Sequence, residues 1–456
     1  MIQYFCPMKI PQLIRNAIIF NEGRSFKGSV LIEDDKIKTI FETNQPSNLP
    51  VFYNETDAEG LWLLPGVIDD QVHFREPGLT HKGDIYTESR AAVAGGITSY
   101  MDMPNTLPQA TTLEVLEEKY TLASQKSLAN YSFLLGATNY NIDELKKADP
   151  QRIPAVKLFM GSSTGNMLVD NSLSLERIFS EAPLMIVTHC EDEKTIRDNI
   201  QYYTNLMGED IPIQYHPLIR SEEACYKSSS LAVELATKHH SRLHVFHLST
   251  AKEMSLFRSD LSLSEKRITA EVCVHHLWFS EADYARYGNR IKWNPAIKKE
   301  SDRLALIDAV NSNKIDVVAT DHAPHLLSEK EGSCLRAASG GPLVQHALPA
   351  MLQMAKGGHF TVEKVVEKMC HAPAELFHID KRGFIRNGFY ADLVLVDPHK
   401  KFCVSSENIL YKCAWSPFEG ISFDHSVVKT WVNGHKVFDN GNFDETIPGQ
   451  RLLFSY

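Results

Sequence analysis

Five side chains suited to metal chemistry stand at or near the ends of short apolar segments in the middle of the chain. His73, His189 and His247 each end one segment, Asp321 follows a fourth, and Lys157 lies within a fifth. A single buried histidine is usually a core residue, but three segments that end in histidine are harder to explain by packing alone. Because imidazole and carboxylate groups are common zinc ligands, this pattern predicts a metal centre.

Lys157 is the unusual member of this set, because a protonated lysine would be repelled by metal cations. Removal from water lowers the pKa of a lysine and makes its amine nucleophilic. The neutral amine can take up CO₂ to form a carbamate, an anionic group whose two oxygens can bridge two metal ions. We therefore hypothesise that Lys157 is N6-carboxylated, and a lysine salt-bridged in the protein interior is the alternative.

The elements that must position these residues are eight short apolar segments separated by longer amphipathic or polar stretches, such as "TTLEVLEEKYTLASQ" and "SSSLAVELATKHH". Near-continuous apolar segments are typical of parallel strands buried on both faces. Eight strand–helix units over about 300 residues fit a (β/α)₈ TIM barrel, in which the carboxyl ends of the strands build the active site. The segments begin at Pro65, Ile97, Tyr131, Ala155, Leu184, Arg242, Ile268 and Asp316.

Both ends of the chain have a different pattern, with short β-rich runs separated by turns. "GSVLIEDDKIKTIF" near the start is interrupted by Asp-Asp, and "VVKTWVNGHKVF" near the end carries Asn433-Gly434, a strong hairpin signal. We predict an α/β protein with a small β-sandwich domain built from residues 1–57 and 385–456. The metal-dependent barrel is predicted over residues 58–384.

Composition and charge argue against several classes of protein. The 456 residues carry a net charge of −10, which gives no support for binding nucleic acid or an anionic membrane. No run reaches the roughly 18 apolar residues of a membrane span, and the first residues lack the features of a secretory signal. Eight cysteines without a C-x-x-C pair predict neither a disulfide scaffold nor a zinc ribbon. We expect a cytoplasmic protein with a small-molecule substrate.

An ordered set of motifs resembles the class I dihydroorotases of the amidohydrolase superfamily. Each motif alone is weak, but the ordered set is specific and extends over nearly the whole chain. The motifs are "PGVIDDQVHFREPG", "MDMPNT", "AVKLFMGSSTG", "VTHCED", "HVFHLST", "ITAEVCVHHL", "VVATDHAPH", "SPFEG" and "TWVNGHKVF".

This resemblance implies a TIM barrel with one or two zinc ions and a small β domain built from both termini. The implied reaction is the reversible cyclisation of N-carbamoyl-L-aspartate to L-dihydroorotate in de novo pyrimidine biosynthesis. Its ring-opening direction would use attack of metal-activated hydroxide on a cyclic amide. The resemblance also leads us to expect a homodimer.

Carried over by position, the resemblance assigns five residues to the metal centre. Asp321 would bind the first metal and act as the catalytic acid and base, taking a proton from water and passing it to the ring nitrogen. His73 would be a further ligand of the first metal. His189 and His247 would hold the second metal, and carboxylated Lys157 would bridge the two ions.

The same resemblance assigns four residues to the substrate. Arg75, Asn105 and His325 would bind its carboxylate, and Asn294 would contact its ring. A guanidinium group binds a carboxylate through two parallel hydrogen bonds, which explains the need for Arg75. A surface ion pair is the alternative interpretation of this arginine.

Gln71 departs from the family pattern, which has histidine at this position. An amide oxygen is a weaker zinc donor than imidazole. With Lys157 carboxylated, the first metal would still have His73, Asp321 and one carbamate oxygen, the usual number of protein ligands for a catalytic zinc. We therefore expect Gln71 to weaken the first metal site, or to donate a hydrogen bond to bound water, without abolishing the site.

Two other functions stay open. Another cyclic amidase, such as an allantoinase or hydantoinase, would have the same barrel and metal cluster, although Arg75 in "HFREPG" favours a ring that carries a carboxylate. The second alternative is a non-catalytic dihydroorotase-like subunit of aspartate transcarbamoylase. Gln71 makes this alternative worth considering, whereas the presence of all five predicted metal-centre residues argues against it.

Overall fold

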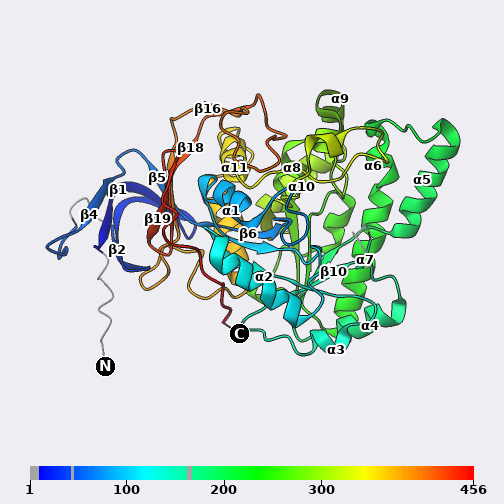
Figure 1. Cartoon of the computed structure of the whole chain (residues 1–456), viewed down its shortest axis with the longest axis horizontal. Helices are drawn as coiled ribbons and strands as arrows, with labels where there is room; N and C mark the ends of the chain where they lie inside the picture. Colours follow the sequence, from blue (N-terminus) through cyan, green and yellow to red (C-terminus); the bar gives the residue numbers. More distant parts are fainter. Residues whose placement is uncertain (1–9, 43–45, 162–166, 456) are drawn as a thin grey trace.

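The computed structural model describes residues 10–42, 46–161 and 167–455. Two parts are visible in Figure 1: a β-rich unit formed by both ends of the chain, and a larger unit of strands and helices formed by its middle. Residues 162–166, which include most of the "GSSTG" stretch quoted above, lie outside the described residues.

The parallel strands of the larger unit coincide with the eight predicted apolar segments. They are β6 (Val67–Val72), β7 (Ile97–Asp102), β8 (Asn130–Phe133), β9 (Leu135–Gly136), β10 (Val156–Phe159), β11 (Ile186–His189), β12 (Leu243–Val245), β13 (Ile268–Cys273) and β14 (Val317–Ala319). The strands β6 to β8 form one sheet and β9 to β14 form another, in sequential order. Nearly every residue in them is buried, which explains the apolar segments.

Contacts join the two parallel sheets at both of their edges. Only Leu134 separates β8 from β9, and Val72 forms a parallel bridge with His322, just after β14. The His73 amide also donates to the His322 carbonyl at 2.7 Å. The result is an α/β structure with parallel strands, consistent with the predicted (β/α)₈ barrel.

Helices connect most of the successive parallel strands, and the two predicted helical stretches are confirmed as α2 and α7. Between β12 and β13 the described chain has only short 3-10 helices. The α-helices are α1 (Ile85–Ala94), α2 (Leu113–Lys126), α3 (Ile142–Leu145), α4 (Ser172–Glu181), α5 (Glu193–Met207), α6 (His216–Ile219), α7 (Glu222–His239), α8 (Val274–Trp278), α9 (Tyr284–Tyr287), α10 (Glu300–Asn311), α11 (Ala347–Lys356), α12 (Val362–Val366) and α13 (Ala372–Leu376).

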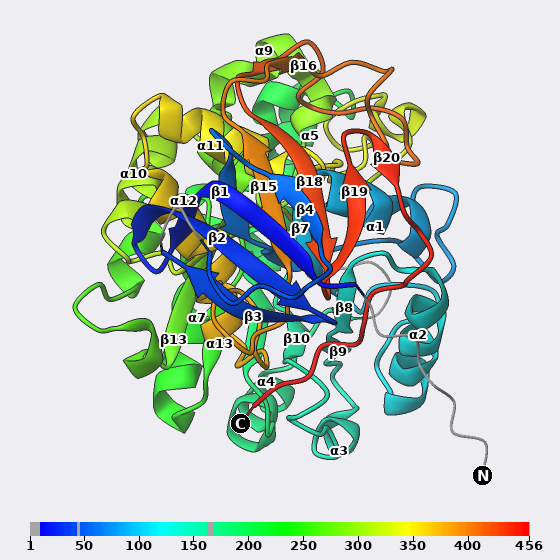
Figure 2. The ribbon, with the colours of Figure 1, turned by 90° about the vertical axis from the view of Figure 1, so that its left-hand side faces the viewer.

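Strands from both ends of the chain form one nine-stranded sheet, which faces the viewer in Figure 2. They are β1 (Gln12–Asn21), β2 (Arg24–Glu33), β3 (Lys36–Phe41), β4 (Asn54–Asp57), β5 (Trp62–Pro65), β15 (Leu393–Asp397), β18 (Ser426–Val432), β19 (His435–Asp439) and β20 (Asn442–Phe443). Their order is β20-β19-β18-β15-β5-β1-β2-β3, with β4 beside β1. The short strands β16 (Phe402–Cys403) and β17 (Ser422–Phe423) pair separately.

The predicted hairpin at Asn433-Gly434 is confirmed between β18 and β19. Both turn residues have positive φ, 50° and 71°, as the favoured two-residue hairpin turn requires. The domain boundaries stay a prediction. In the structure β5, which follows residue 57, pairs with β1 and β15 in the terminal sheet.

A buried polar network fastens the terminal sheet to the parallel strands. Asp392, just before β15, accepts hydrogen bonds from Arg382, from Asn130 at the start of β8, and from the Asn433 amide. Asn433 also donates to Asn130 Oδ1 at 2.7 Å. Because all four residues are buried, water does not compete with these contacts, and they hold the β18–β19 turn against the start of β8.

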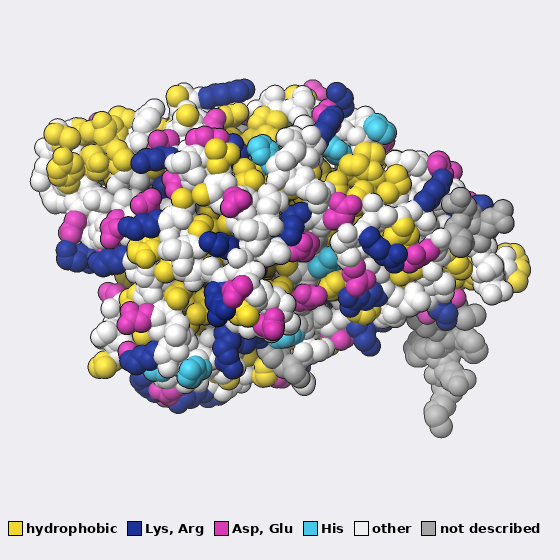
Figure 3. Space-filling model, turned by 180° about the vertical axis from the view of Figure 1, so that it is seen from behind, with side chains coloured by type: hydrophobic (Ala, Val, Ile, Leu, Met, Phe, Trp, Pro, Cys, Tyr) yellow, Lys and Arg dark blue, Asp and Glu magenta, His cyan; other side chains and the backbone are white. Residues whose placement is uncertain are grey.

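The surface shows mixed charge on the face drawn in Figure 3, where Lys and Arg side chains lie among Asp and Glu side chains. Among the described residues, none of the helices has the length and apolar character needed to cross a bilayer. The expectation that neither nucleic acid nor a membrane is a partner stays a prediction.

A buried ion pair links α2 to the end of β7, beside the predicted metal ligands. Lys119 Nζ donates to Asp102 Oδ2 at 2.7 Å and to the Met103 carbonyl at 2.9 Å, and both charged side chains are fully buried. Asp102 Oδ1 accepts from the Phe74 amide at 2.8 Å. The pair therefore holds the backbone that directly follows His73.

Replacement of Lys119 by methionine should lower the free energy of unfolding by about 3–5 kcal/mol, because the Asp102 charge would stay buried without its partner. Chemical denaturation followed by circular dichroism measures this loss. Lys194→Met is the matched control, since Lys194 forms an exposed pair with Asp198 at 2.7 Å and its replacement should change the free energy of unfolding little. Equal losses in the two variants would show that the buried pair is not a stabilising contact.

Candidate metal and substrate site

A cavity of about 540 Å³ lies at the carboxyl ends of the parallel strands and brings together every site residue that the sequence predicts. A larger cavity, of about 920 Å³, is lined by residues that precede β12 and β13 and by residues around α13, and contains none of them. The roles of the predicted residues stay predictions. In the smaller cavity they are Gln71, His73, Arg75, Asn105, Lys157, His189, His247, Asn294, Asp321 and His325.

The four predicted histidine and aspartate ligands form two pairs. His73 Nε2 lies 3.1 Å from Asp321 Oδ1, and His189 Nδ1 lies 3.0 Å from His247 Nε2. The first pair comes from the ends of the adjacent strands β6 and β14, and the second from the ends of β11 and β12. Each pair offers two donors of the kind that zinc prefers, so the residues fit two metal ions if a further ligand is shared between them.

Lys157, in β10, is the residue that could supply this shared ligand. Its side chain is almost completely buried, and its Nζ lies 4.8 Å and 4.2 Å from the ring centroids of Phe159 and Phe246. Burial lowers the pKa of Lys157 to about 8, although the charges of Glu271 and Asp321 oppose the shift. A measurable fraction of the side chain is therefore neutral amine near pH 7, the form that reacts with CO₂.

Gln71 is buried beside the first pair and contacts it directly. Its Nε2 lies 3.4 Å from Asp321 Oδ1, the same oxygen that His73 contacts, and its Oε1 lies 3.7 Å from Cys273 Sγ. In this orientation the side-chain nitrogen faces the Asp321 carboxylate. Gln71 thus acts as a donor to a predicted ligand instead of presenting its oxygen to a cation.

Three basic side chains converge at another wall of the cavity, which we call the cationic corner: Arg75, Lys82 and His325. Arg75 Nη2 lies 3.1 Å from His325 Nε2, and Lys82 Nζ lies 3.1 Å from His325 Nδ1. Burial lowers the pKa of His325, and the charges of Arg75 and Lys82 lower it further. A neutral imidazole can accept at only one of its two nitrogens, so one cationic donor lacks an acceptor there. Only Glu329, 2.8 Å from Lys82, adds a negative charge among the ion pairs described at this corner.

Three site residues have left-handed backbone conformations. Arg75, His247 and Asp321 have φ values of 69°, 39° and 46°. Such conformations cost about 1–3 kcal/mol in a non-glycine residue and persist only where the surroundings impose them. Here the Arg75 carbonyl accepts from the Leu79 amide at 2.9 Å, and the His247 amide donates to Glu271 Oε1 at 3.0 Å.

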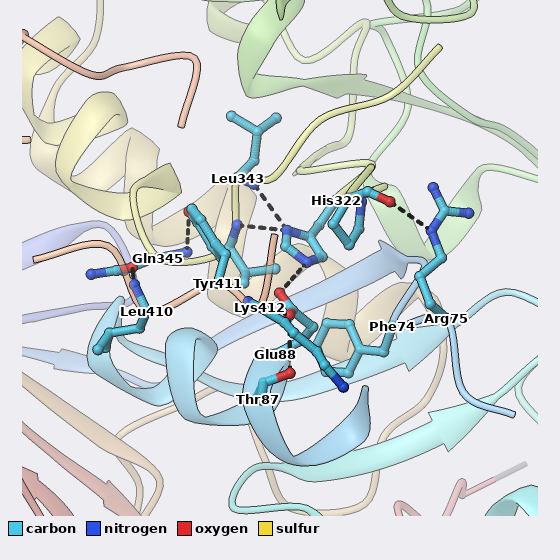
Figure 4. A network of polar contacts seen from close by, with 12 residues as sticks. Phe74, Arg75, Thr87, Glu88, His322, Leu343, Gln345, Leu410, Tyr411 and Lys412 are labelled. Carbon is cyan, nitrogen blue, oxygen red and sulfur yellow. Dashed lines mark hydrogen bonds and ion pairs between the residues drawn. The ribbon is translucent and has the colours of Figure 1, made fainter. Parts of the chain in front are cut away.

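A network behind the cavity, drawn in Figure 4, holds the chain next to Asp321. His322 Nδ1 accepts from the Leu343 amide at 2.9 Å, so its Nε2–H donates to Glu88 Oε2, also at 2.9 Å. Glu88, in α1, accepts as well from the Lys412 amide at 3.0 Å. Burial lowers the pKa of His322 although Glu88 opposes the shift, which keeps the ring neutral and this pattern of hydrogen bonds intact.

Sequence reasoning missed Lys82, Glu88 and this role of His322. Glu88 lies in a helical stretch, where a carboxylate is ordinarily exposed, so only the packing of α1 reveals its role. For Lys82 and His322 the sequence does hold a signal, because both lie in or beside the motifs that carry the resemblance, in "THKGDIY" and "TDHAPH".

Comparison with known proteins identifies the family. The model of the amidohydrolase family matches residues 62–437. A dihydroorotase from Methanosarcina acetivorans is 33% identical over 90% of this chain and 88% of its own length, and one from Carboxydothermus hydrogenoformans is 32% identical over 92% and 95%. The chain belongs to the dihydroorotase family of amidohydrolases.

Solved structures of related amidohydrolases have the same fold. L-Hydantoinase (dihydropyrimidinase) from Arthrobacter aurescens superposes with a TM-score of 0.91 at 25% identity and covers 98% of this chain and 100% of its own. A dihydropyrimidinase from Brevibacillus agri NCHU1002 has a TM-score of 0.86 at 22% identity, over 97% and 98%, a likeness that shows the fold alone. The family and the relatives support a cyclic amidohydrolase.

Glu88→Gln should lower kcat/KM by about tenfold and the free energy of unfolding by about 1–2 kcal/mol, because it removes a charged acceptor from the buried His322. Steady-state kinetics and chemical denaturation measure the two effects. Glu445→Gln is the matched control: Glu445 accepts from Tyr86 of the same helix at 2.9 Å but is exposed, so it should change little. If the two variants behave alike, the network does not hold the site.

Proposed function

We propose that this protein is a zinc-dependent dihydroorotase that interconverts N-carbamoyl-L-aspartate and L-dihydroorotate. The observation that carries the proposal is the cationic corner, which lies in the same cavity as the two ligand pairs. Dihydroorotate combines a cyclic amide with a carboxylate. A site for it therefore needs groups that activate the amide and a cationic group that binds the carboxylate.

The cationic corner suits this carboxylate. The Arg75 guanidinium donates through Nε to the Pro324 carbonyl at 3.0 Å, which fixes its plane within the cavity. Neutral His325 can accept a hydrogen bond from only one of Arg75 and Lys82. A carboxylate placed against these two side chains would accept the hydrogen bond that the other one offers. Asn105 and Asn294 line the same cavity, where Asn105 would bind the carboxylate and Asn294 would contact the ring.

The donor sets of the two pairs suit zinc. His73 and Asp321 would hold one ion and His189 and His247 the other, with carboxylated Lys157 shared between them. When bound, the ions would polarise the ring carbonyl and lower the pKa of the attacking water. Asn105 Oδ1, 2.8 Å from His73 Nδ1, fixes that ring so that Nε2 faces Asp321.

Asp321 would move the proton of this reaction. His73 and Gln71 contact the same oxygen, Oδ1, and so orient the carboxylate at the cavity wall. In ring opening Asp321 would take a proton from the attacking water and pass it to the leaving ring nitrogen. In cyclisation the proton would move in the opposite direction.

The first test is the rate at which purified protein, supplied with zinc and bicarbonate, opens L-dihydroorotate. We expect turnover in the natural protein and a loss of about 10²- to 10⁴-fold in Asp321→Asn, because the proton carrier is removed. A folded, zinc-replete protein without turnover would contradict the proposal and favour the non-catalytic subunit of aspartate transcarbamoylase.

A substrate panel separates dihydroorotase from the hydantoinase-like alternative that the structural likeness to L-hydantoinase keeps open. Dihydrouracil has the same ring without the carboxylate, so Arg75→Met should lower kcat/KM for dihydroorotate by about 10- to 100-fold and leave any turnover of dihydrouracil unchanged. A natural protein that opens hydantoin or dihydrouracil faster than dihydroorotate would favour the alternative.

Carboxylation of Lys157 predicts a dependence on pH. Since its pKa is about 8, the neutral fraction rises from about one tenth at pH 7 to about nine tenths at pH 9. At a fixed concentration of dissolved CO₂, the initial rate of carbamate formation should rise about tenfold over this range. Carbon-13 NMR of protein supplied with labelled bicarbonate measures the carbamate, with Lys157→Met as control. A signal that persists in this variant would place the carbamate elsewhere.

The proposal also covers the closure of the barrel, the form of the terminal domain and the cellular compartment. We propose that the parallel strands form a closed (β/α)₈ barrel and the terminal strands a β-sandwich, supported by the contacts that join the two parallel sheets. All seven cysteines in the described part of the chain are free thiols, which fits the reducing cytoplasm. A homodimer and an association with aspartate transcarbamoylase stay predictions.

A further inference from the structure

A second group of potential metal ligands lies beneath the cavity, among residues to which the proposed activity assigns no role. Asp70 in β6, His244 in β12 and Glu271 in β13 offer ligand atoms that all lie within 4.8 Å of one another. All three side chains are fully buried. In the strand order β6 does not pair with β12 or β13, so these side chains meet across the interior of the parallel strands.

The atoms that face one another in this group have no hydrogen-bond partner. They are Asp70 Oδ1 and Oδ2, His244 Nε2 and Glu271 Oε2. The remaining polar atoms of two residues are occupied, because His244 Nδ1 pairs with Thr269 Oγ1 at 2.8 Å and Glu271 Oε1 accepts from the His247 amide at 3.0 Å. These contacts aim His244 Nε2 and Glu271 Oε2 at the same point, as the outer partners of metal ligands do.

The distances between these atoms can be compared with those expected for a direct hydrogen bond, for a bridging water and for a shared metal ion. His244 Nε2 lies 3.5 Å from Asp70 Oδ2 and 3.8 Å from Glu271 Oε2. Charge-assisted hydrogen bonds are about 2.7–2.9 Å long, and a bridging water would hold its partners about 4.5 Å apart. Ligands at about 2.1 Å from a tetrahedral zinc ion lie about 3.4 Å from one another, which is closest to the observed separations.

The negative charge of the two buried carboxylates also favours a bound cation. Two carboxylates without water around them are costly unless protons or a metal ion neutralise them. Burial and the Asp70 charge raise the pKa of Glu271. Burial opposes protonation of His244, but Asp70 and Glu271 outweigh it and raise the pKa of His244 to about 9. A divalent cation between these side chains would neutralise the two carboxylates.

We propose that Asp70, His244 and Glu271 bind a divalent transition-metal cation, separate from the ions of the proposed catalytic centre. The ion would tie β6, β12 and β13 together beneath the cavity. Because Glu271 also holds the amide of His247, whose φ is 39°, the ion would stabilise the strained backbone of a predicted catalytic-centre ligand. Since the group is fully buried, the ion would enter during folding and exchange slowly afterwards.

Anomalous X-ray diffraction at the zinc edge, on crystals of the natural protein produced in zinc-supplied medium, tests the proposal directly. We expect an anomalous peak within about 2.2 Å of Asp70, His244 and Glu271, apart from any peak at His189 and His247. Absence of a peak between these three residues would overturn the proposal and leave an imidazolium between two carboxylates as the structure of the group. A missing peak at His189 and His247 would instead count only against the catalytic centre.

Metal content provides the second measurement, on protein produced in zinc-supplied medium and dialysed against metal-free buffer. Asp70→Asn should contain one equivalent of zinc per chain less than the natural protein, measured by mass spectrometry of the elements. Glu176→Gln is the matched control, because Glu176 pairs with His239 at 2.5 Å on the surface and should leave the zinc content unchanged. Natural zinc content in folded Asp70→Asn would overturn the proposal; if that variant does not fold, the diffraction result decides.

Discussion

The removal of charged groups from water is the constraint on which the centre of this structure depends. Lys157, Asp70 and Glu271 are all buried within the parallel strands, where an isolated charge is costly. Burial lowers the pKa of Lys157 to about 8 and raises that of Glu271, because it disfavours the charged form of each group. The same physical effect underlies both the proposed carboxylation of Lys157 and the proposed cation site.

Around this centre, the cavity depends on backbone held in unusual conformations. Asp321 and His247 follow strands and have positive φ, and each is supported from behind. Glu271 accepts from the amide of His247, and the His322–Glu88 network fixes the residue after Asp321. The first support comes from the interior and the second from α1, so these predicted site residues are held from both the inner and the outer side of the parallel strands.

Gln71 illustrates how one substitution can be accommodated. Its amide binds zinc more weakly than an imidazole does. In the structure Gln71 instead contacts the carboxylate of Asp321. His73 Nε2 also lies 3.1 Å from the same oxygen of Asp321, so the contact within the first predicted ligand pair is present beside the amide. The position at which the family pattern has histidine therefore holds a residue that contacts and orients a predicted ligand.

The sequence by itself determined much of this protein. Eight apolar segments predicted the parallel strands because buried strands need near-continuous apolar residues, and Asn433-Gly434 predicted a hairpin because few residues adopt positive φ. The sequence singled out ten of the residues that line the cavity. Tertiary structure alone decided that Lys82 joins Arg75 and His325, that Glu88 supports His322, and that Asp70 meets His244 and Glu271. These contacts join segments far apart in the chain, and local sequence patterns report the period and ends of a strand but not which side chains meet across the interior.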